Sequence, residues 1–230
     1  MSDLLLSNLA KLLGQYQRLT GQPNGDRAFT ALQLARPWLM PAGFVTPKLM
    51  LHATGYQFDT PLADGATTAS RLVPTLSLDS GLVFERELGL FGRDLIQTLE
   101  PRAFYVRTPY RNQNNIPNYD SGDGGFNVAT VFTENAFVGN DKISDANLLT
   151  LGLTSRLIDD ANGAEVARIG AAQRLRFEDQ RVTLAQNGTP VTQLWSDILV
   201  GGSVKWTKAW SMDATTQYNP EIKASQRSTV

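Results

Sequence analysis

The sequence predicts an all-β fold, an antiparallel up-and-down meander of the kind that forms transmembrane β-barrels. Apolar and polar residues alternate along several segments of about ten residues. The connections between these segments alternate between shorter and longer ones, and aromatic residues lie near segment ends. A soluble β-sandwich would share the alternation but would not need the asymmetry of the connections. These patterns therefore favour a barrel over a sandwich.

The asymmetry can be read directly from the chain. The shorter connections are at 85–94, 159–163 and 207–209, and the longer ones are at 59–69, 108–145 and 178–193. The aromatic residues near strand ends are Tyr105, Phe177, Trp206, Trp210 and Tyr218. Short turns at one end, long loops at the other and aromatic girdles are typical of outer-membrane barrels.

Composition excludes several classes of protein. Hydrophobic residues make up 42% of the chain, charged residues 19%, and the net charge is −1, which argues against a disordered or nucleic-acid-binding chain. There is no run of about 18 apolar residues, as a transmembrane helix would need. The chain has no cysteine and one histidine, His52, so a disulfide framework or a histidine-rich metal site is not expected. Its N-terminus lacks the pattern of an export signal, so an exported chain of this kind is expected to be a fragment.

The first half of the chain contains four predicted strands. Residues 3–19 fit a helix with one leucine-rich face, or an irregular start, or a strand from Tyr16 onward, and a turn follows at 21–25. Pro74 should lie at the start of its strand or at a bulge, because proline removes a ladder hydrogen bond. The predicted strands are 29–36, 46–58, 72–84 and 95–107.

The second half begins with a long polar connection. Residues 108–145 are rich in Asn, Gly and Asp and show no strand periodicity. A connection of this length usually marks function or disorder. The turn at 159–163 predicts a hairpin. The predicted strands after the connection are 149–157, 167–177, 198–206 and 210–218.

Polar residues on the strands predict an ion-paired, water-facing surface rather than an active site. Glu100 and Arg102 share one face of a strand and could pair with each other or across the ladder. A catalytic dyad would need a second carboxylate or a histidine nearby, so we expect no enzyme, no catalytic residues and no cofactor. The candidate lumen-facing residues are Lys48, Asp79, Glu100, Arg102, Arg156, Arg168, Arg174 and Arg176.

Two further interpretations remain open at this point. Arg168, Arg174 and Arg176 share one strand face, and arginine binds phosphate bidentately, but an ordinary polar lumen would also hold arginines. Asp120, Asp141 and Asp145 offer oxygen ligands for calcium. Without a calcium-loop spacing they are better explained as solvated or turn-capping aspartates, so no metal site is predicted.

The long connection is predicted to be an extracellular loop. Its polar residues keep it soluble, while its phenylalanines provide side chains that can pack, which suggests a folded cap over the barrel mouth. The candidate loop residues are Pro109, Asn118, Asp120, Phe126, Phe132 and Phe137.

Several short runs resemble one protein family over residues 24–180. They include GDR at 25–27, LDSGL at 78–82, QTLEPR at 97–102, IPNYD at 116–120 and DAN at 145–147. In this order and spacing they resemble the middle part of the C-terminal β-barrel domain of the LPS-assembly outer-membrane protein family LptD, also called organic solvent tolerance protein. On this resemblance, residues 1–230 form a single partial β-barrel domain of a large transmembrane barrel, without the family's N-terminal jelly-roll domain.

The resemblance also implies a function and a location. The chain is expected to be part of the translocon that inserts lipopolysaccharide into the outer leaflet of the Gram-negative outer membrane, as a passive conduit. The implied partners are lipopolysaccharide, a plug lipoprotein of the LptE type, periplasmic LPS bridge proteins acting through the jelly roll, the barrel-assembly machinery and outer-membrane lipid, with no nucleic acid. The alternative function is an outer-membrane diffusion porin or channel fragment.

Overall fold

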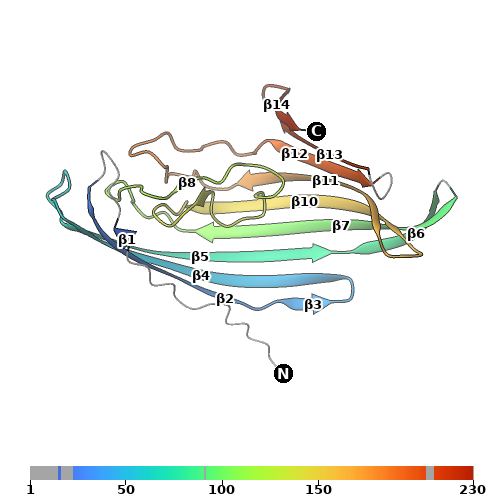
Figure 1. Cartoon of the computed structure of the whole chain (residues 1–230), viewed down its shortest axis with the longest axis horizontal. Helices are drawn as coiled ribbons and strands as arrows, with labels where there is room; N and C mark the ends of the chain where they lie inside the picture. The colour runs from blue at the N-terminus through green and yellow to red at the C-terminus, as the bar shows by residue number, and fades with distance from the viewer. Residues whose placement is uncertain (1–14, 17–22, 91, 206–209, 230) are drawn as a thin grey trace.

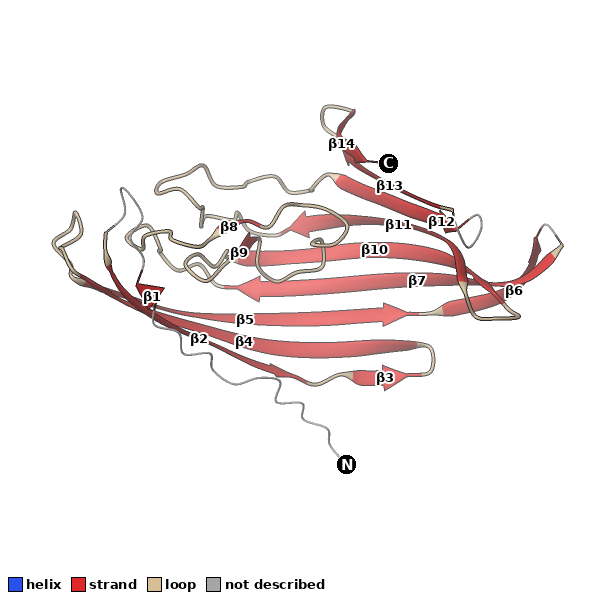
Figure 2. Ribbon diagram, in the orientation of Figure 1, coloured by secondary structure: helices blue, strands red, loops and turns tan. Residues whose placement is uncertain are grey.

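The computed structural model describes residues 15–16, 23–90, 92–205 and 210–229. This part of the chain consists of strands, turns and loops (Figure 2). Among these residues no helix is long and apolar enough to cross a membrane. Of the segment 3–19, Gln15–Tyr16 form a short strand, and the rest lies outside the described residues.

One large antiparallel sheet dominates the described chain, with its strands side by side in chain order (Figure 1). The predicted up-and-down meander is confirmed. The sheet has 12 strands in the described residues, ten on the path β1-β2-β4-β5-β7-β10-β11-β12-β13-β14, with β3 paired to β4 and β6 paired to β7. The strands are β1 (Gln15–Tyr16), β2 (Gly25–Ala35), β3 (Trp38–Met40), β4 (Gly43–Phe58), β5 (Thr68–Leu82), β6 (Phe84–Leu90), β7 (Arg93–Thr108), β10 (Ala146–Asp159), β11 (Glu165–Arg176), β12 (Ile198–Lys205), β13 (Ser211–Asn219) and β14 (Ala224–Thr229).

The sheet is curved and open. Its two edges are β1 and β14, which do not pair with each other in the described residues (Figure 1). The tight turns after β3 and β10 lie at one end of the strands, while the long connections after β4, β7 and β11 lie at the other, together with the short turn between β13 and β14. This is the asymmetry of connections that the sequence indicated.

Three prolines lie inside strands, and the expectation that Pro74 starts its strand or sits at a bulge is wrong. Strand β5 pairs with β7 only from Leu76 onward, so Pro74 has a ladder neighbour on β4 alone. Pro47 lies opposite the gap between β2 and β3, and Pro101 opposite the gap between β5 and β6. Each proline is tolerated because its strand lacks a paired neighbour on one side at that point.

The structure also moves several predicted boundaries. The region 85–94, predicted as a connection, is mostly strand β6, which forms a hairpin with β7. The predicted strand 72–84 begins earlier, at Thr68, and is interrupted at Val83. Strands β3 and β14 are additional to the prediction, and the connection 207–209 lies outside the described residues.

The two faces of the sheet differ in chemistry. One face is covered at its loop end by the connection between β7 and β10, which also forms the small sheet β8 (Gly122–Asp123) and β9 (Phe137–Val138) (Figure 2). The opposite face exposes large apolar side chains. On the central strands these are Leu49, Leu72, Leu76, Leu78, Leu82, Leu99, Leu151, Leu153 and Ile169.

The buried core lies between the long loop and the sheet. One cluster joins Phe104, Val106, Ala146 and Leu148 of β7 and β10 to Phe132 of the loop. A second joins Tyr56, Phe58 and Ala69 to Ile116, with Tyr119 packed against them. A β-sandwich would require a second large sheet here, and the described residues supply only the two short strands β8 and β9.

Candidate functional site on the loop-covered face

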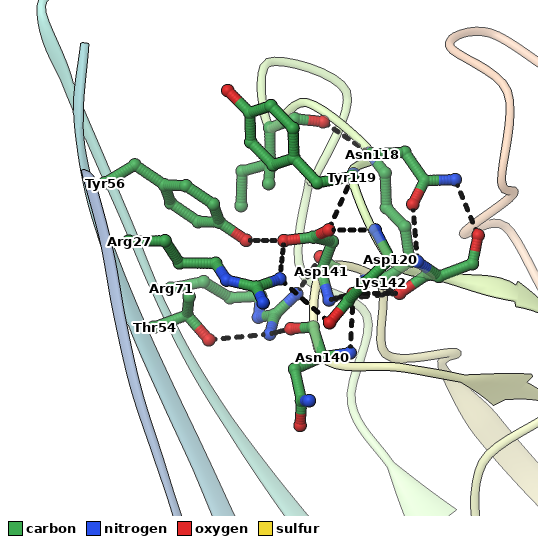
Figure 3. Close-up of polar contacts among 12 residues, drawn as sticks. Arg27, Thr54, Tyr56, Arg71, Asn118, Tyr119, Asp120, Asn140, Asp141 and Lys142 are labelled. Atoms are coloured by element: carbon green, nitrogen blue, oxygen red, sulfur yellow. Dashed lines mark hydrogen bonds and ion pairs between the residues drawn. The ribbon is translucent and has the colours of Figure 1, made fainter. Parts of the chain in front are cut away.

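The loop is fastened to the sheet by the buried carboxylate of Asp141 (Figure 3). Its Oδ1 accepts hydrogen bonds from Arg27 Nη1 on β2 and from Tyr56 OH on β4, both at 2.7 Å. Its Oδ2 accepts the backbone N–H groups of Tyr119 and Asp120, also at 2.7 Å. Arg27 and Tyr56 are direct ladder partners, so the sheet register places them side by side. A carboxylate with four donors is satisfied although it has no contact with solvent.

Arg71 on β5 adds a second attachment beside the first (Figure 3). Its Nη1 donates to the backbone oxygen of Asp141 and to Gln113 Oε1, the latter at 2.9 Å. Its Nη2 donates to Asn140 O at 2.7 Å and to Thr54 Oγ1 at 3.0 Å. The planar guanidinium thus holds both ends of the loop against the sheet.

Asp120 closes the loop on itself. Its Oδ1 accepts the backbone N–H groups of Asn140 (2.9 Å) and Asp141 (3.1 Å), and its Oδ2 lies 3.0 Å from Arg27 Nη1. Burial by itself would raise the pKa of the Asp120 carboxyl, but these hydrogen bonds and the charge of Arg27 outweigh it and lower that pKa. Asp120 is therefore expected to stay ionised wherever the loop is folded near neutral pH.

Lys142 is one of the most deeply buried side chains of the loop, with 2% of its surface exposed. Its Nζ donates to the backbone oxygens of Gln113 and Ile116, the latter at 2.8 Å. Burial, together with the charge of Arg71, lowers the pKa of Lys142 to about 8. The ammonium group thus joins the first and last parts of the loop and titrates near physiological pH.

Phe132 anchors the middle of the loop to the sheet. Its ring packs edge-on against Phe104, and the guanidinium carbon of Arg102 lies 4.1 Å from its centroid. Arg102 also forms a bidentate pair with Asp79, at 2.9 and 2.7 Å. A Cβ atom at Gly152 would lie 2.6 Å from Phe132 Cζ, so only glycine leaves room for the ring in this position.

Further charged groups on this face pair across neighbouring strands, within one strand or with the loop. Arg156 Nη2 of β10 lies 3.0 Å from Glu100 Oε2 of β7. Arg168 Nε lies 3.7 Å from Glu165 Oε1 on its own strand. Lys48 of β4 pairs with Glu134 of the loop. The result is a polar surface whose charges are largely neutralised by one another.

A second loop, between β11 and β12, is held by Asp145. The backbone N–H groups of Arg181 and Val182 donate to the Asp145 carboxylate at 2.8 to 3.1 Å. The Arg181 guanidinium also lies 4.0 Å from the ring centroid of Tyr110 in the long loop. The two loops are thus joined to each other as well as to the sheet.

The candidate lumen residues from the sequence all lie on this loop-covered face by register. Arg102 pairs with Asp79, Glu100 with Arg156 and Lys48 with Glu134, while Arg168 lies beside Glu165. Arg174 and Arg176 lie further toward the loop end and line a cleft between the two loops.

The candidate loop residues fall into two groups. Asp120, Phe126 and Phe132 contact side chains of the large sheet, namely Arg27, Arg174 and Arg102, whereas Phe137 lies in the short strand β9. Asn118 stays within the loop, donating through Nδ2 to Ser121 O at 2.9 Å, and Pro109 follows the end of β7.

Sequence reasoning missed the residues that fasten the loop. It expected the three aspartates to be solvated or turn-capping; the solvated alternative is wrong for Asp141 and Asp145, whose exposed fractions are 0% and 5%. Arg27, Tyr56 and Arg71 were not identified as loop contacts. The available signal was that each occupies the polar face of a strand at its loop end, where a charged or hydroxyl group needs a partner.

Chemically, this arrangement positions a loop and lines a surface.

Residues 7–230 match the family model described as LptD, LPS transport system D. The LPS-assembly protein LptD of Polaromonas sp. (strain JS666) is 68% identical over 212 residues, covering 92% of this chain and 26% of the relative. The proteins of the same name from Albidiferax ferrireducens and Burkholderia thailandensis are 61% and 45% identical, covering 92% and 91% of this chain and 26% and 27% of their own lengths. The chain spans about a quarter of the length of the curated relatives it matches.

Proposed function

This chain belongs to the LptD family, and from that premise we propose that it forms part of the barrel wall through which lipopolysaccharide is inserted into the outer leaflet of the outer membrane. The alternative of a diffusion porin is set aside, because the matched family is an LPS transport family. Members of this family act in transport and assembly, so the proposed role is a conduit and scaffold rather than a catalyst.

The observation that carries this proposal is the separation of the two faces of the sheet. Strands β4, β5, β7 and β10 have 14 to 16 residues. At roughly 3.3 Å per residue, such strands cross an apolar band of about 25 Å even when tilted by about 40°. Their outer face exposes leucines, while their inner face carries ion pairs and the folded loop. This is the pattern of a strand between lipid and water.

Aromatic side chains support the same orientation. Tyr105 and Phe177 contact each other near the loop end, with ring centroids 6.5 Å apart. Near the opposite end, Trp38 and Phe84 are exposed on strands β3 and β6. We assign these two levels to the membrane interfaces, where aromatic rings have an apolar body in lipid and a polar edge in water.

In this account the loop-covered face is the barrel lumen and the long loop is an extracellular cap. The lumen surface, lined by the charged residues assigned above, would let hydrated sugar pass without binding it tightly, because most of its charges are paired. The outer face would contact membrane lipid. Family membership is the support for the remaining partners we propose: a plug lipoprotein of the LptE type, periplasmic bridge proteins and the barrel-assembly machinery.

The proposal is tested with a chimera in which this chain replaces the matching segment of the Polaromonas relative. The chimera is expressed in cells depleted of their own LptD, and lipopolysaccharide on the surface of intact cells is measured by antibody binding. We expect surface lipopolysaccharide to match that of cells carrying the unaltered relative. A chimera that assembles in the outer membrane, conducts ions freely and delivers no lipopolysaccharide would contradict the proposal and favour a channel.

A further inference from the structure

A cleft of about 680 Å³ opens between the long loop, the second loop and the sheet. Arg174 and Arg176 of β11 form part of its wall, as does His52 of β4, and Phe126 and Gln193 come from the two loops. The cleft is therefore bounded by elements from both halves of the chain. None of the loop-fastening groups around Asp141 lines it.

Arg176 stands out in this cleft because two of its guanidinium N–H groups have no hydrogen-bond partner, although the carboxylates of Asp145 and Asp179 attract its charge from beyond ion-pair distance. Its Nε and Nη1 atoms are buried and make no hydrogen bond to any part of the chain that the structure describes. Buried N–H groups of arginine are normally paired, and a charged one left unpaired is costly. Such a group on the wall of a cleft indicates a place for an anion.

The neighbouring Arg174 is fixed in place beside it. Its Nη2 donates to Val131 O at 2.7 Å and its Nε to Thr150 Oγ1 at 3.3 Å. Its guanidinium carbon lies 5.4 Å from the ring centroid of Phe126. These neutral partners leave the charge of Arg174 uncompensated, so it adds to the positive potential at Arg176.

The carboxylates that line the cleft are already engaged. Glu134 pairs with Lys48 and accepts the hydroxyl of Ser77 at 3.0 Å. Asp197 accepts Gln217 Nε2 at 2.6 Å, and Asp123 accepts the backbone N–H of Gly125 at 2.8 Å. None of the three forms an ion pair with either arginine among the described residues.

We propose that this cleft binds an anionic sugar, with Arg176 contacting its phosphate or carboxylate group. Guanidinium groups recognise both anions through paired N–H donors. The amide of Gln193 and the ring of Phe126 provide a polar and an apolar contact for the sugar itself. The inference rests on the proposed function for its ligand, which would be the acidic, phosphorylated core of lipopolysaccharide on its way through the lumen.

The test is binding of core oligosaccharide to the purified chimera by titration calorimetry. Three probes are compared: the intact oligosaccharide, the same molecule without its phosphates, and the same molecule with its carboxyl groups reduced. We expect Arg176→Gln to weaken binding of the intact probe about tenfold. Arg176→Lys should weaken it less, because lysine keeps the positive charge but loses the paired N–H donors of the guanidinium group. The matched control is Arg168→Gln, on the same strand and face but beside Glu165, which should leave binding within about twofold.

The outcomes separate the inference from the proposed function. Loss of affinity on removing phosphates identifies a phosphate contact, and loss on reducing carboxyl groups identifies a carboxylate contact. Equal binding of all probes to the chimera and to a folded Arg176→Gln variant would overturn the site, even if the chimera still delivers lipopolysaccharide. A photo-crosslinker at position 193 that captures a protein instead of lipopolysaccharide would also overturn it. Specific binding of the intact probe by a chimera that fails to deliver lipopolysaccharide would leave the site standing and the proposed function refuted.

Discussion

Asp141 and Arg27 lie 114 positions apart in the chain, and their carboxylate and guanidinium groups meet at 2.7 Å beneath the long loop. Strand β2 and the loop end before β10 are thereby joined by one buried ion pair. The pair explains why a loop of this length is folded: its closing segment is attached to the sheet by charge and hydrogen bonds rather than by strand pairing.

Asp141→Asn should loosen the loop. The amide has a similar size but one acceptor oxygen fewer, and its NH₂ group would face donors from Tyr56 or the loop backbone. We expect a loss of about 2–3 kcal/mol in the stability of the folded loop. Protease cleavage in the loop of the assembled chimera should become faster, whereas Asp123→Asn, at an exposed position in the same loop, should have no effect. Equal cleavage rates for both variants would argue against the Asp141 attachment.

Gly152→Ala should displace Phe132, because the new methyl group would meet the ring at 2.6 Å. The ring cannot move without losing its contact with Arg102, so we expect destabilisation of about 1–3 kcal/mol in thermal unfolding of the folded chimera. The control is Gly55→Ala on β4, where an added Cβ would meet nothing within 4 Å. Adding Phe132→Ala should make the Gly152→Ala change nearly neutral. If the losses of stability caused by Gly152→Ala and Phe132→Ala simply add in the double variant, the ring of Phe132 does not clash with the new methyl group.

Loop stability should rise with pH above 8. The pKa of Lys142 is lowered to about 8 in the folded loop, while the unfolded value is 10.5. Between these values the unfolded loop binds more protons, so raising the pH favours the folded loop by up to about tenfold per pH unit. Protease cleavage of the opened loop, corrected for enzyme activity, should therefore slow between pH 8 and 9.5. Lys142→Met should abolish this dependence, and a dependence that persists in the variant would assign it to another group.

Deleting residues 122–138 should remove the cap without preventing barrel assembly. The deleted part contributes Phe132 and the strands β8 and β9, whereas the Asp141 attachment lies outside it. We expect normal membrane insertion of the chimera but increased sensitivity of the cells to large antibiotics that the intact outer membrane excludes. Unchanged sensitivity would mean that this loop does not cover the pore.

The sheet could be predicted from sequence because strand alternation is a local pattern. The exact ends of the strands could not be predicted, because they depend on which strands pair with each other. Pro74, for example, fits inside β5 only because the pairing of β5 with β7 starts at Leu76. The loop-fastening site around Asp141 could not be predicted for the same reason. Asp141 looks like any polar loop residue until the fold brings Arg27 and Tyr56 to it from strands far away in sequence. The sequence did predict that Glu100 and Arg102 could form ion pairs across the ladder, because directly opposed residues of neighbouring strands lie on one face. The structure pairs Glu100 with Arg156 and Arg102 with Asp79.

The central claim, that one face of the sheet meets lipid and the other meets water, is tested most directly along β10. The chain has no cysteine, so single cysteines can be placed at 151, 153, 154 and 156 and labelled with nitroxide in the membrane-embedded chimera, after thiols elsewhere have been replaced. Leu151 and Leu153 are exposed on the apolar face, while Thr154 and Arg156 lie on the ion-paired face. Labels at 151 and 153 should be accessible to oxygen dissolved in lipid, and labels at 154 and 156 to a water-soluble nickel complex. Equal accessibility at all four positions, or the reverse pattern, would contradict the account.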